Sequence, residues 1–200
     1  HYRRTFEAPR LQPGERTWLV FEALDLSAVI HLNGREIGRH ANAFYPCRIE
    51  ITEFLAEGEN TLLVTVESGL FHAMERNVAG LGVATNYQLT KRPWLRKTQS
   101  DHGWDWAPRL LNVGIPGHVW LETAAGVRWD ECVVLAELSD DLTTGTIIAR
   151  VFAEGLEEEE AVETTLTVTA AGHTETVPVS IVPGMNRLET TLTIPKPELW

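Results

Sequence analysis

Residues 96–108 read Arg-Lys-Thr-Gln-Ser-Asp-His-Gly-Trp-Asp-Trp-Ala-Pro and hold the densest group of chemically useful side chains in the sequence. Asp105 stands between Trp104 and Trp106, downstream of an adjacent arginine and lysine. Aromatic faces beside a carboxylate that accepts hydrogen bonds suit the recognition of a sugar ring. The segment therefore predicts a carbohydrate-binding site.

The backbone around these residues is expected to form a loop. In a regular strand the two tryptophans would share one face and the carboxylate between them would point to the other. Gly103 and Pro108 favour a loop instead. Residues 83–117 show little periodicity, and so long an irregular stretch in a compact domain usually has a functional reason.

The sequence offers no complete catalytic constellation. It contains no GxSxG, Walker-type, HExxH or dinucleotide-binding motif. Glycoside hydrolysis needs two carboxyl groups about 5 to 10 Å apart. Asp101 and Asp105 are the acids within the aromatic loop, but Asp101 is more typical of a turn former. No catalytic residue is therefore assigned in this chain.

Metal and cofactor sites are not expected either. The two cysteines, Cys47 and Cys132, lie far apart and form no CxxC or His-rich group. They are interpreted as buried free thiols. No cofactor is predicted.

The elements that must position the loop are mostly strands. Asn33-Gly34 predicts a type I′ hairpin, because this turn needs positive φ at both positions. Thr52 is a candidate cap for a helical turn at 52–55, and residues 70–80 have the spacing of a short helix. Short apolar or alternating runs predict strands at 1–7, 17–23, 28–32, 48–51, 61–66 and 119–123.

The second part of the chain predicts an immunoglobulin-like sandwich without the Cys…Trp…Cys pattern of antibody domains. The acidic run at 157–160 is interpreted as a solvated loop. Five candidate strands lie at 132–138, 146–153, 161–169, 174–181 and 187–194. The predicted fold class is thus all-β.

The two parts of the chain differ in net charge. Residues 1–125 carry 13 Lys or Arg and 14 Asp or Glu, whereas residues 126–200 carry 4 and 14. This break, together with the strand at 119–123, predicts domains at 1–124 and 125–200. The net charge of -11 argues against nucleic-acid binding. No apolar run has the length of a transmembrane helix and no signal peptide is visible, so a cytoplasmic location is favoured.

Four motifs resemble the N-terminal half of glycoside hydrolase family 2, in its β-mannosidase branch. Three are turn motifs shared across the family, at 20–25, 32–38 and 57–62. The fourth is Arg-Lys leading to Gly-Trp-Asp-Trp-Ala-Pro within 96–108, which is specific to the branch. The resemblance is close from residue 1 to about residue 123. Over residues 126–200 it rests only on the order of the domains.

This resemblance implies a galactose-binding-like jelly-roll domain that lacks its usual first strands, then an immunoglobulin-like domain. It also implies a (β/α)8 barrel that carries the acid/base and nucleophile glutamates of a retaining mechanism. A barrel takes about 250 residues, so 200 residues do not hold it as well. The expectation is an accessory portion that is inactive alone, whose partners are its own barrel and a terminal β-mannoside or related oligosaccharide.

Carried over residue by residue, the family pattern makes Asp105 an acceptor of hydrogen bonds from hydroxyls of the nonreducing-end sugar and Trp104 a wall of the pocket. Asn42 is a further substrate-binding candidate, although a structural turn residue is favoured at that position. Arg96 and Lys97 would support the site by pairing with acids on the barrel, or are plain surface charges.

Trp106 is a supporting residue for which a place in the core is favoured. The sequence departs from the family pattern at Ala107, His102 and 115–117, where Gly, an aromatic residue and Gly-Ile-Trp are usual. These departures leave the shape of the loop and the choice of substrate open.

Three alternatives remain. The first is a freestanding carbohydrate-binding module, and the second is a purely structural or adhesive pair of sandwiches. The third is the same portion of a β-galactosidase, β-glucuronidase or exo-glucosaminidase, since these enzymes share the scaffold.

Overall fold

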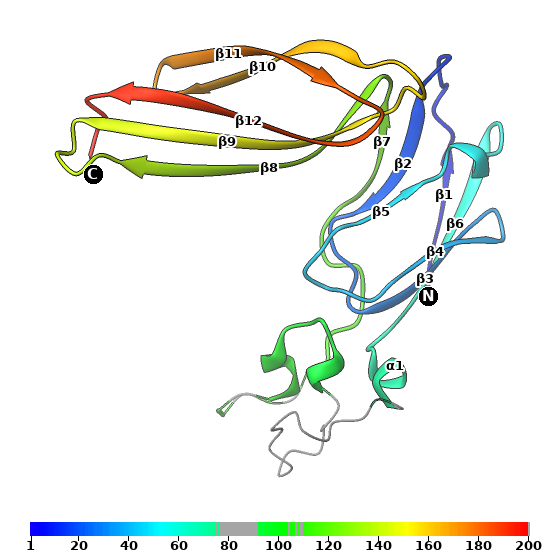
Figure 1. Cartoon of the computed structure of the whole chain (residues 1–200). Coiled ribbons are helices and arrows are strands. Elements are labelled where there is room, and N and C mark those ends of the chain that lie inside the picture. Colours follow the sequence, from blue (N-terminus) through cyan, green and yellow to red (C-terminus); the bar gives the residue numbers. More distant parts are fainter. Residues whose placement is uncertain (75, 77–91, 104, 107, 109, 200) are drawn as a thin grey trace. The chain divides into compact units, whose positions relative to one another are not determined.

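The computed structural model describes the whole chain except residues 75, 77–91, 104, 107, 109 and 200. Two units are resolved by their internal contacts, His1–Thr123 and Ala124–Trp200, and each is described by itself (Figure 1). Both are built from strands, so the prediction of an all-β chain is confirmed. No helix in the described residues is long and apolar enough to span a membrane.

The first unit contains two sheets. Antiparallel pairs join the four strands of the larger sheet. Its order is β1 (Tyr2–Glu7), β6 (Glu59–Glu67), β3 (Ser27–Leu32) and β4 (Arg35–His40). The smaller sheet has the order β5 (Cys47–Glu50), β2 (Arg16–Phe21) and β7 (Val119–Ala124).

The core of this unit lies between the sheets. Alternation places Ala28, Ile30 and Leu32 of β3 on one buried face, as expected for a strand with one face in the core. Leu19 and Phe21 of β2 join the same cluster. Burying an aliphatic side chain of this size contributes about 1.5 to 3 kcal/mol, so the sandwich is a firm support for its loops.

Local turn chemistry follows the sequence at the hairpin but not at the predicted cap. Asn33 and Gly34 have φ of 52° and 79° and connect β3 to β4, which confirms the hairpin. The short helix η1 (Thr52–Phe54) begins after Ile51 and has no side-chain cap. Thr52 instead accepts a hydrogen bond from the Thr17 amide at 2.9 Å, so the predicted cap was wrong.

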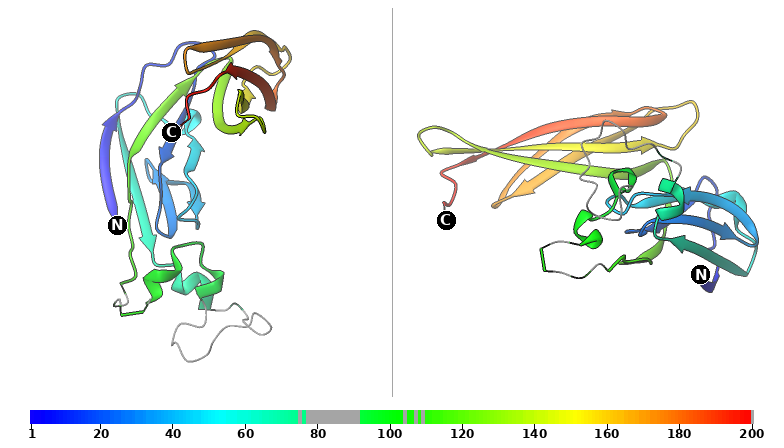
Figure 2. Two further views of the ribbon diagram at one scale, coloured as in Figure 1. Left: turned by 90° about the vertical axis from the view of Figure 1, so that its left-hand side faces the viewer. Right: turned by 90° about the horizontal axis from the view of Figure 1, so that it is seen from below.

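Three short helices gather at one end of the first unit (Figures 1 and 2). They are α1 (Leu70–Met74), η2 (Arg92–Trp94) and η3 (Gln99–His102). The helix predicted at 70–80 is therefore present over its first five residues, and most of its remainder lies outside the described residues.

The second unit is a sandwich of two antiparallel sheets. All five strands predicted from the sequence are present and extend by one to five residues at one or both ends. The larger sheet has the order β12 (Gly184–Pro195), β9 (Thr144–Gly155) and β8 (Val127–Leu138). The other is a ribbon of β10 (Val162–Ala170) and β11 (His173–Ile181).

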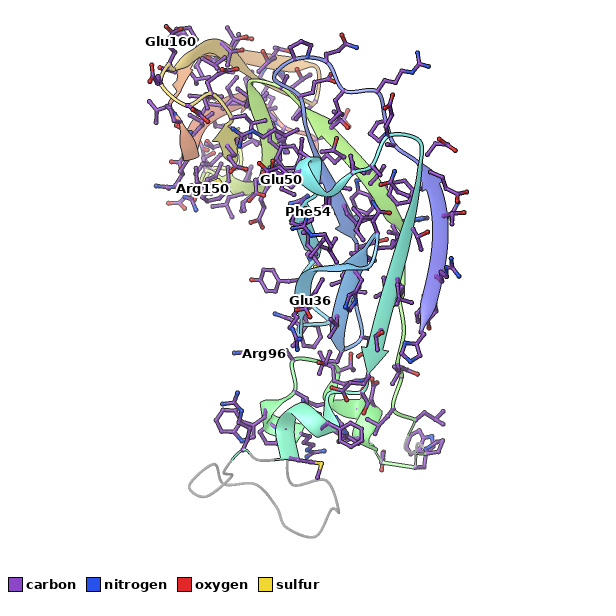
Figure 3. All side chains as sticks on the ribbon, turned by 90° about the vertical axis from the view of Figure 1, so that its right-hand side faces the viewer. Glu36, Glu50, Phe54, Arg96, Arg150 and Glu160 are labelled. Atoms are coloured by element: carbon purple, nitrogen blue, oxygen red, sulfur yellow. The ribbon has the colours of Figure 1, made fainter. Side chains whose placement is uncertain are left out.

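Two sequence expectations about side-chain exposure have different outcomes in the structure. Residues 157–160 are exposed between β9 and β10, and Figure 3 shows Glu160 at the surface, which confirms the solvated loop. Both cysteines are free, but only Cys47 is buried, and burial raises the pKa of its thiol to about 11. Cys132 is exposed on β8, so the expectation of a buried thiol was wrong there.

Candidate functional site

Backbone hydrogen bonds fasten the irregular segment to the first unit at two points. Asp25, which precedes β3, exchanges two bonds of 2.9 and 2.8 Å with Gly114. Ala43, in the connection from β4 to β5, donates its amide to the carbonyl of Arg96 at 2.8 Å. The segment is therefore joined to the sandwich on both sides of the Trp-Asp-Trp triplet.

An apolar cluster provides a third attachment. Leu26, Ala73 and Leu95 are fully or almost fully buried and pack together, with Leu70 and Ala43 against them. Each of the three comes from a different part of the chain: the residue before β3, helix α1 and the residue after η2. The cluster ties α1 and the irregular segment to the end of the sandwich.

Lys97 is the electrostatic centre of this end of the unit. Its side chain is 1% exposed, and Nζ lies 2.9 Å from Asp25 Oδ1 and 3.6 Å from Asp101 Oδ2. Nζ also donates a 2.6 Å hydrogen bond to the carbonyl of Asn112. One buried cation thus joins the start of β3 to η3 and to the strand-like return at 112–114.

These contacts correct the interpretation of the Arg-Lys pair. Lys97 is neither a surface charge nor available for acids elsewhere, because its ammonium is used within the unit. Arg96 is different, since its side chain is exposed and extends away from the fold (Figure 3). Asp101, expected as a turn former, lies in η3 and also faces the lysine.

His102 was noted in the sequence only as a departure from the family pattern. Its ring is 2% exposed, and neither ring nitrogen has a hydrogen-bond partner among the described residues. Burial lowers the pKa of the imidazole below its ordinary value, and the charges of Lys97 and Arg92 lower it further, while Asp101 and Asp25 act in the opposite sense. His102 is therefore a buried ring whose pKa lies below the ordinary value of an imidazole.

A hollow of about 510 Å³ opens beside the lysine cluster. The carboxylates of Asp25 and Asp101 and the rings of Tyr2 and Phe44 are among its lining groups. Carboxylates that accept hydrogen bonds beside aromatic rings are suited to polyhydroxylated ligands. Its complete lining is Tyr2, Asp25, Ala43, Phe44, Thr98, Asp101, Asn112, Val113, Gly114, Ile115 and Pro116.

Asp105 and Trp106 are presented to solvent. Asp105 is exposed with φ of 48°, and no described residue bonds its carboxylate. Trp106 is 90% exposed, so the expectation of a core indole was wrong for this chain. Trp104 lies outside the described residues. Among the described residues, then, nothing occupies the carboxylate of Asp105, which leaves it available for a ligand.

Asn42 is occupied by its own turn. Its side-chain oxygen accepts the Phe44 amide at 3.0 Å, and its carbonyl lies 2.6 Å from Nε2 of His40. The favoured interpretation of a structural turn residue agrees with these contacts. Asn42 nevertheless sits next to Ala43 and Phe44, which line the hollow.

The two carboxylates of the irregular segment have different surroundings. Asp101 lies beside the buried ammonium, whereas Asp105 is exposed and has no hydrogen-bond or ion-pair partner among the described residues. In the described residues no group of three or more His, Cys, Asp or Glu could hold a metal ion. The site presents hydrogen-bond acceptors and aromatic surface on an anchored loop.

Residues 1–117 match the family model described as the glycosyl hydrolase 2 galactose-binding domain-like domain, which includes every residue of the site. The chain belongs to this family. The glycosyl hydrolase 2 assignment agrees with the motifs at 20–25, 32–38, 57–62 and 96–108, which lie within the match.

Two β-mannosidases are similar to this chain over its whole length. The chain is 31% identical over 206 residues to beta-mannosidase B of Emericella nidulans, covering 100% of this chain and 24% of that protein. The crystal structure of the β-D-mannosidase of Dictyoglomus thermophilum superposes with a TM-score of 0.80 at 27% identity, over 100% of this chain and 24% of that one.

More distant structures share the fold alone. The exo-chitosanase CsxA of Amycolatopsis orientalis has a TM-score of 0.67 at 19% identity, over 100% of this chain and 21% of that one. The chain spans about a quarter of the length of the two β-mannosidases that it matches. The glycosyl hydrolase 2 fold is therefore shared by enzymes whose names state different substrates.

Proposed function

We propose that this chain is the N-terminal portion of a β-mannosidase-like, retaining exo-glycosidase that hydrolyses terminal β-mannosidic bonds. The observation that carries the proposal is the exposed carboxylate of Asp105, which has no partner among the described residues, on a loop anchored to the sandwich, in a chain that aligns with a β-mannosidase along its full length. The chain itself supplies no catalytic group. Its role is to complete an active site built on a (β/α)8 barrel elsewhere in the parent polypeptide.

In this account Asp105 accepts hydrogen bonds from hydroxyls of the nonreducing-end mannose. A charged acceptor makes stronger bonds than a neutral one, and a bond that tightens as the ring distorts towards the transition state lowers the barrier. Trp104 walls the pocket, with Trp106 and the exposed Arg96 as supporting residues. Because a loop closes one side of the pocket, only chain ends enter, which gives exo action.

The chemistry proceeds on the barrel. A retaining glycosidase uses two carboxyl groups about 5 to 5.5 Å apart, one as acid/base and one as nucleophile. The present chain positions the sugar relative to them. Positioning of this kind is sensitive to displacements of the order of 1 Å, so the anchors at Lys97 and Leu95 belong to the function as well as to the fold.

Aryl glycosides test the substrate class. The parent enzyme is expected to hydrolyse 4-nitrophenyl β-mannoside with a kcat/KM at least about 100-fold above those for the β-galactoside, β-glucuronide and β-glucosaminide, a difference of about 2.7 kcal/mol. A preference for one of the other three would assign this chain to the corresponding enzyme of the shared scaffold. Hydrolysis of none of them would contradict the proposal.

A freestanding carbohydrate-binding module is the second candidate, favoured by the exposed rings of Phe44, Tyr45 and Trp106. Calorimetric titration of the isolated chain with mannose and manno-oligosaccharides separates the two. Half a site is expected to bind in the millimolar range or not at all, since most of the surface that would desolvate the ligand is absent. Tight binding that is lost in Asp105→Ala would establish the module instead.

A further inference from the structure

The hollow beside Lys97 has the size of a ligand site. Its volume of about 510 Å³ lies within the range of about 300 to 1,000 Å³ that is typical of small-molecule sites. Its lining comes from β1, the residues before β3, the β4–β5 connection and residues 98–101 and 112–116 of the irregular segment. Strand β1 begins at the end of the first unit where the short helices gather (Figure 1), which brings Tyr2 to the hollow.

Two carboxylates in the hollow are fixed by the buried ammonium. The side chains of Asp25 and Asp101 are 12% and 15% exposed, whereas the side chain of Lys97 is closed to solvent. Lys97 Nζ lies 2.9 Å from Asp25 Oδ1 and 3.6 Å from Asp101 Oδ2. The lysine therefore holds both carboxylates while part of each remains exposed. Acceptors that are fixed before binding lose little conformational freedom when a ligand binds.

The charges around the hollow select against anions. Two carboxylates and one ammonium leave a net charge of -1, and the other lining residues of the hollow are uncharged. Carboxylate oxygens accept hydrogen bonds from hydroxyl groups and repel another carboxylate or a phosphate. The hollow therefore suits a ligand that has several hydroxyl groups and no negative charge.

Two aromatic rings complete the walls. Tyr2 is 46% exposed and Phe44 is 63% exposed. The turn that carries Phe44 is fixed, because the Phe44 amide donates to Asn42 Oδ1 at 3.0 Å and the Ala43 amide donates to the Arg96 carbonyl at 2.8 Å. An aromatic face can bury the apolar face of a sugar ring while the carboxylates accept bonds from its hydroxyls.

Gly114 makes room for the tyrosine ring. A Cβ built on Gly114 would lie 2.9 Å from Tyr2 Oη, which is closer than real Cβ atoms approach other groups. Tyr2 Oη is the far end of an exposed side chain, so an alanine at position 114 would displace the ring without moving the backbone. The absence of a side chain at Gly114 thus sets the shape of this wall.

Asp101 connects the hollow to Asp105. The two aspartates are four residues apart in one segment, so their Cα atoms lie no more than about 14 Å from each other. One oligosaccharide can reach both positions. In the proposed function Asp105 binds the nonreducing-end sugar, and in an exo-glycosidase the remaining sugars of the substrate belong to the leaving group. A substrate sugar in the hollow is therefore a leaving-group sugar.

We propose that the hollow is a leaving-group subsite for a neutral sugar of an oligosaccharide substrate. Phe44 packs against the face of that sugar, and Asp101 accepts hydrogen bonds from its hydroxyls. The proposal rests on the proposed function, because it takes the parent to be a β-mannosidase-like enzyme with Asp105 at the nonreducing end. The subsite makes the parent enzyme prefer oligosaccharides to mannosides that have no sugar in the leaving group.

Two substrates separate this subsite from the rest of the active site. β-1,4-Mannotriose has a sugar leaving group, whereas the leaving group of β-mannosyl fluoride is a single fluoride ion. In the parent enzyme Phe44→Ala should lower kcat/KM for mannotriose by at least about tenfold, mainly through a higher KM, because the contact is made in the ground state and in the transition state alike. For the fluoride the change should be less than about twofold.

Tyr45→Ala is the matched control. Tyr45 is adjacent to Phe44 and 67% exposed, but it does not line the hollow. This substitution should change kcat/KM by less than about twofold for both substrates. Because both rings are exposed, neither variant should shift the Tm by more than about 2 °C.

A second pair of variants tests the shape of the hollow. Gly114→Ala should raise the KM for mannotriose by at least about fivefold and leave the values for β-mannosyl fluoride unchanged. Tyr2→Ala should also raise the KM for mannotriose, and in that background Gly114→Ala should have no further effect, since the ring that it displaces is absent. An equal effect of Gly114→Ala with and without the tyrosine would contradict this account of the wall.

The outcomes distinguish the subsite from the proposed function. Equal losses of kcat/KM for mannotriose and the fluoride in Phe44→Ala would place Phe44 at the nonreducing-end sugar and contradict the subsite. An unchanged kcat/KM for mannotriose would also contradict it. In both cases the wild-type parent still hydrolyses mannosides, so the proposed function stands. A parent that hydrolyses neither substrate would contradict the proposed function and the subsite together.

Discussion

At the scale of single residues, the irregular loop depends on one buried ammonium. Lys97 faces two carboxylates and one carbonyl from separate parts of the chain, and its side chain is closed to solvent. An ion in such a place is not a large net source of stability, but its removal leaves buried carboxylates without a cation. The lysine therefore specifies where the loop begins relative to the sandwich.

The substitution Lys97→Met should lower the free energy of unfolding of the first unit by about 3 to 5 kcal/mol, because Asp25 and Asp101 lose their counter-charge. Urea unfolding followed by fluorescence measures it. Arg39→Met is the matched control, since Arg39 pairs with Glu36 at the exposed surface and should leave the midpoint unchanged. Equal effects of the two substitutions would show that the buried cluster does not stabilise the unit.

The sugar-binding role of Asp105 is a prediction from its neighbours in the sequence, whereas the contacts of Lys97 could not be predicted in this way. The lysine is adjacent to an exposed arginine, and its partner Asp25 is distant in the chain, so only the fold brings the two together. The prediction that Trp106 lies in the core was wrong for a related reason. A tryptophan favours burial on average, but here the loop places it outward.

At the scale of elements, two connections at the other end of the first unit share one buried amide. Oδ1 of Asn60, at the start of β6, accepts bonds from the Ala56 amide at 2.8 Å and from Asn33 Nδ2 at 2.7 Å. Its Nδ2 donates to the carbonyls of Ala56 and Gly58, both at 2.9 Å. The β3–β4 hairpin and the turn before β6 are thus held as one structure.

Replacing Asn60 by Ala should destabilise the first unit by about 3 kcal/mol, because four hydrogen bonds of a buried side chain are lost. The Ala56 amide should also lose protection from hydrogen exchange. Asn112→Ala is the control, since Asn112 is exposed and offers the lysine its backbone carbonyl. An Asn60 variant as stable as this control would show that the network is not needed.

Alternation and turn residues predicted most strands and the Asn33-Gly34 hairpin, because these signals are local. The errors arose where a distant group competed. The hydroxyl oxygen of Thr52 accepts a hydrogen bond from the amide of Thr17, and the side chain therefore does not cap the helix. Cys132 has the period of a buried residue, yet no described strand covers it, and pattern alone does not reveal which inner faces are covered.

At the scale of the whole molecule, the two units differ in charge and in what each leaves open. The first presents an anchored loop with the exposed carboxylate of Asp105, and the second presents exposed apolar side chains such as Val134 on strand β8. The chain spans about a quarter of the length of its β-mannosidase relatives. In this account substrate recognition is completed by other parts of the parent.

The central claim is that Asp105 binds the sugar in the parent enzyme, and the most direct test is the kcat/KM of Asp105→Ala on 4-nitrophenyl β-mannoside. Asp140→Ala, an exposed aspartate of the second unit, is the control. The account predicts a loss of at least about 100-fold, equivalent to about 2.7 kcal/mol, with an unchanged Tm because the carboxylate has no partner among the described residues. A kcat/KM equal to that of the Asp140 variant would contradict it.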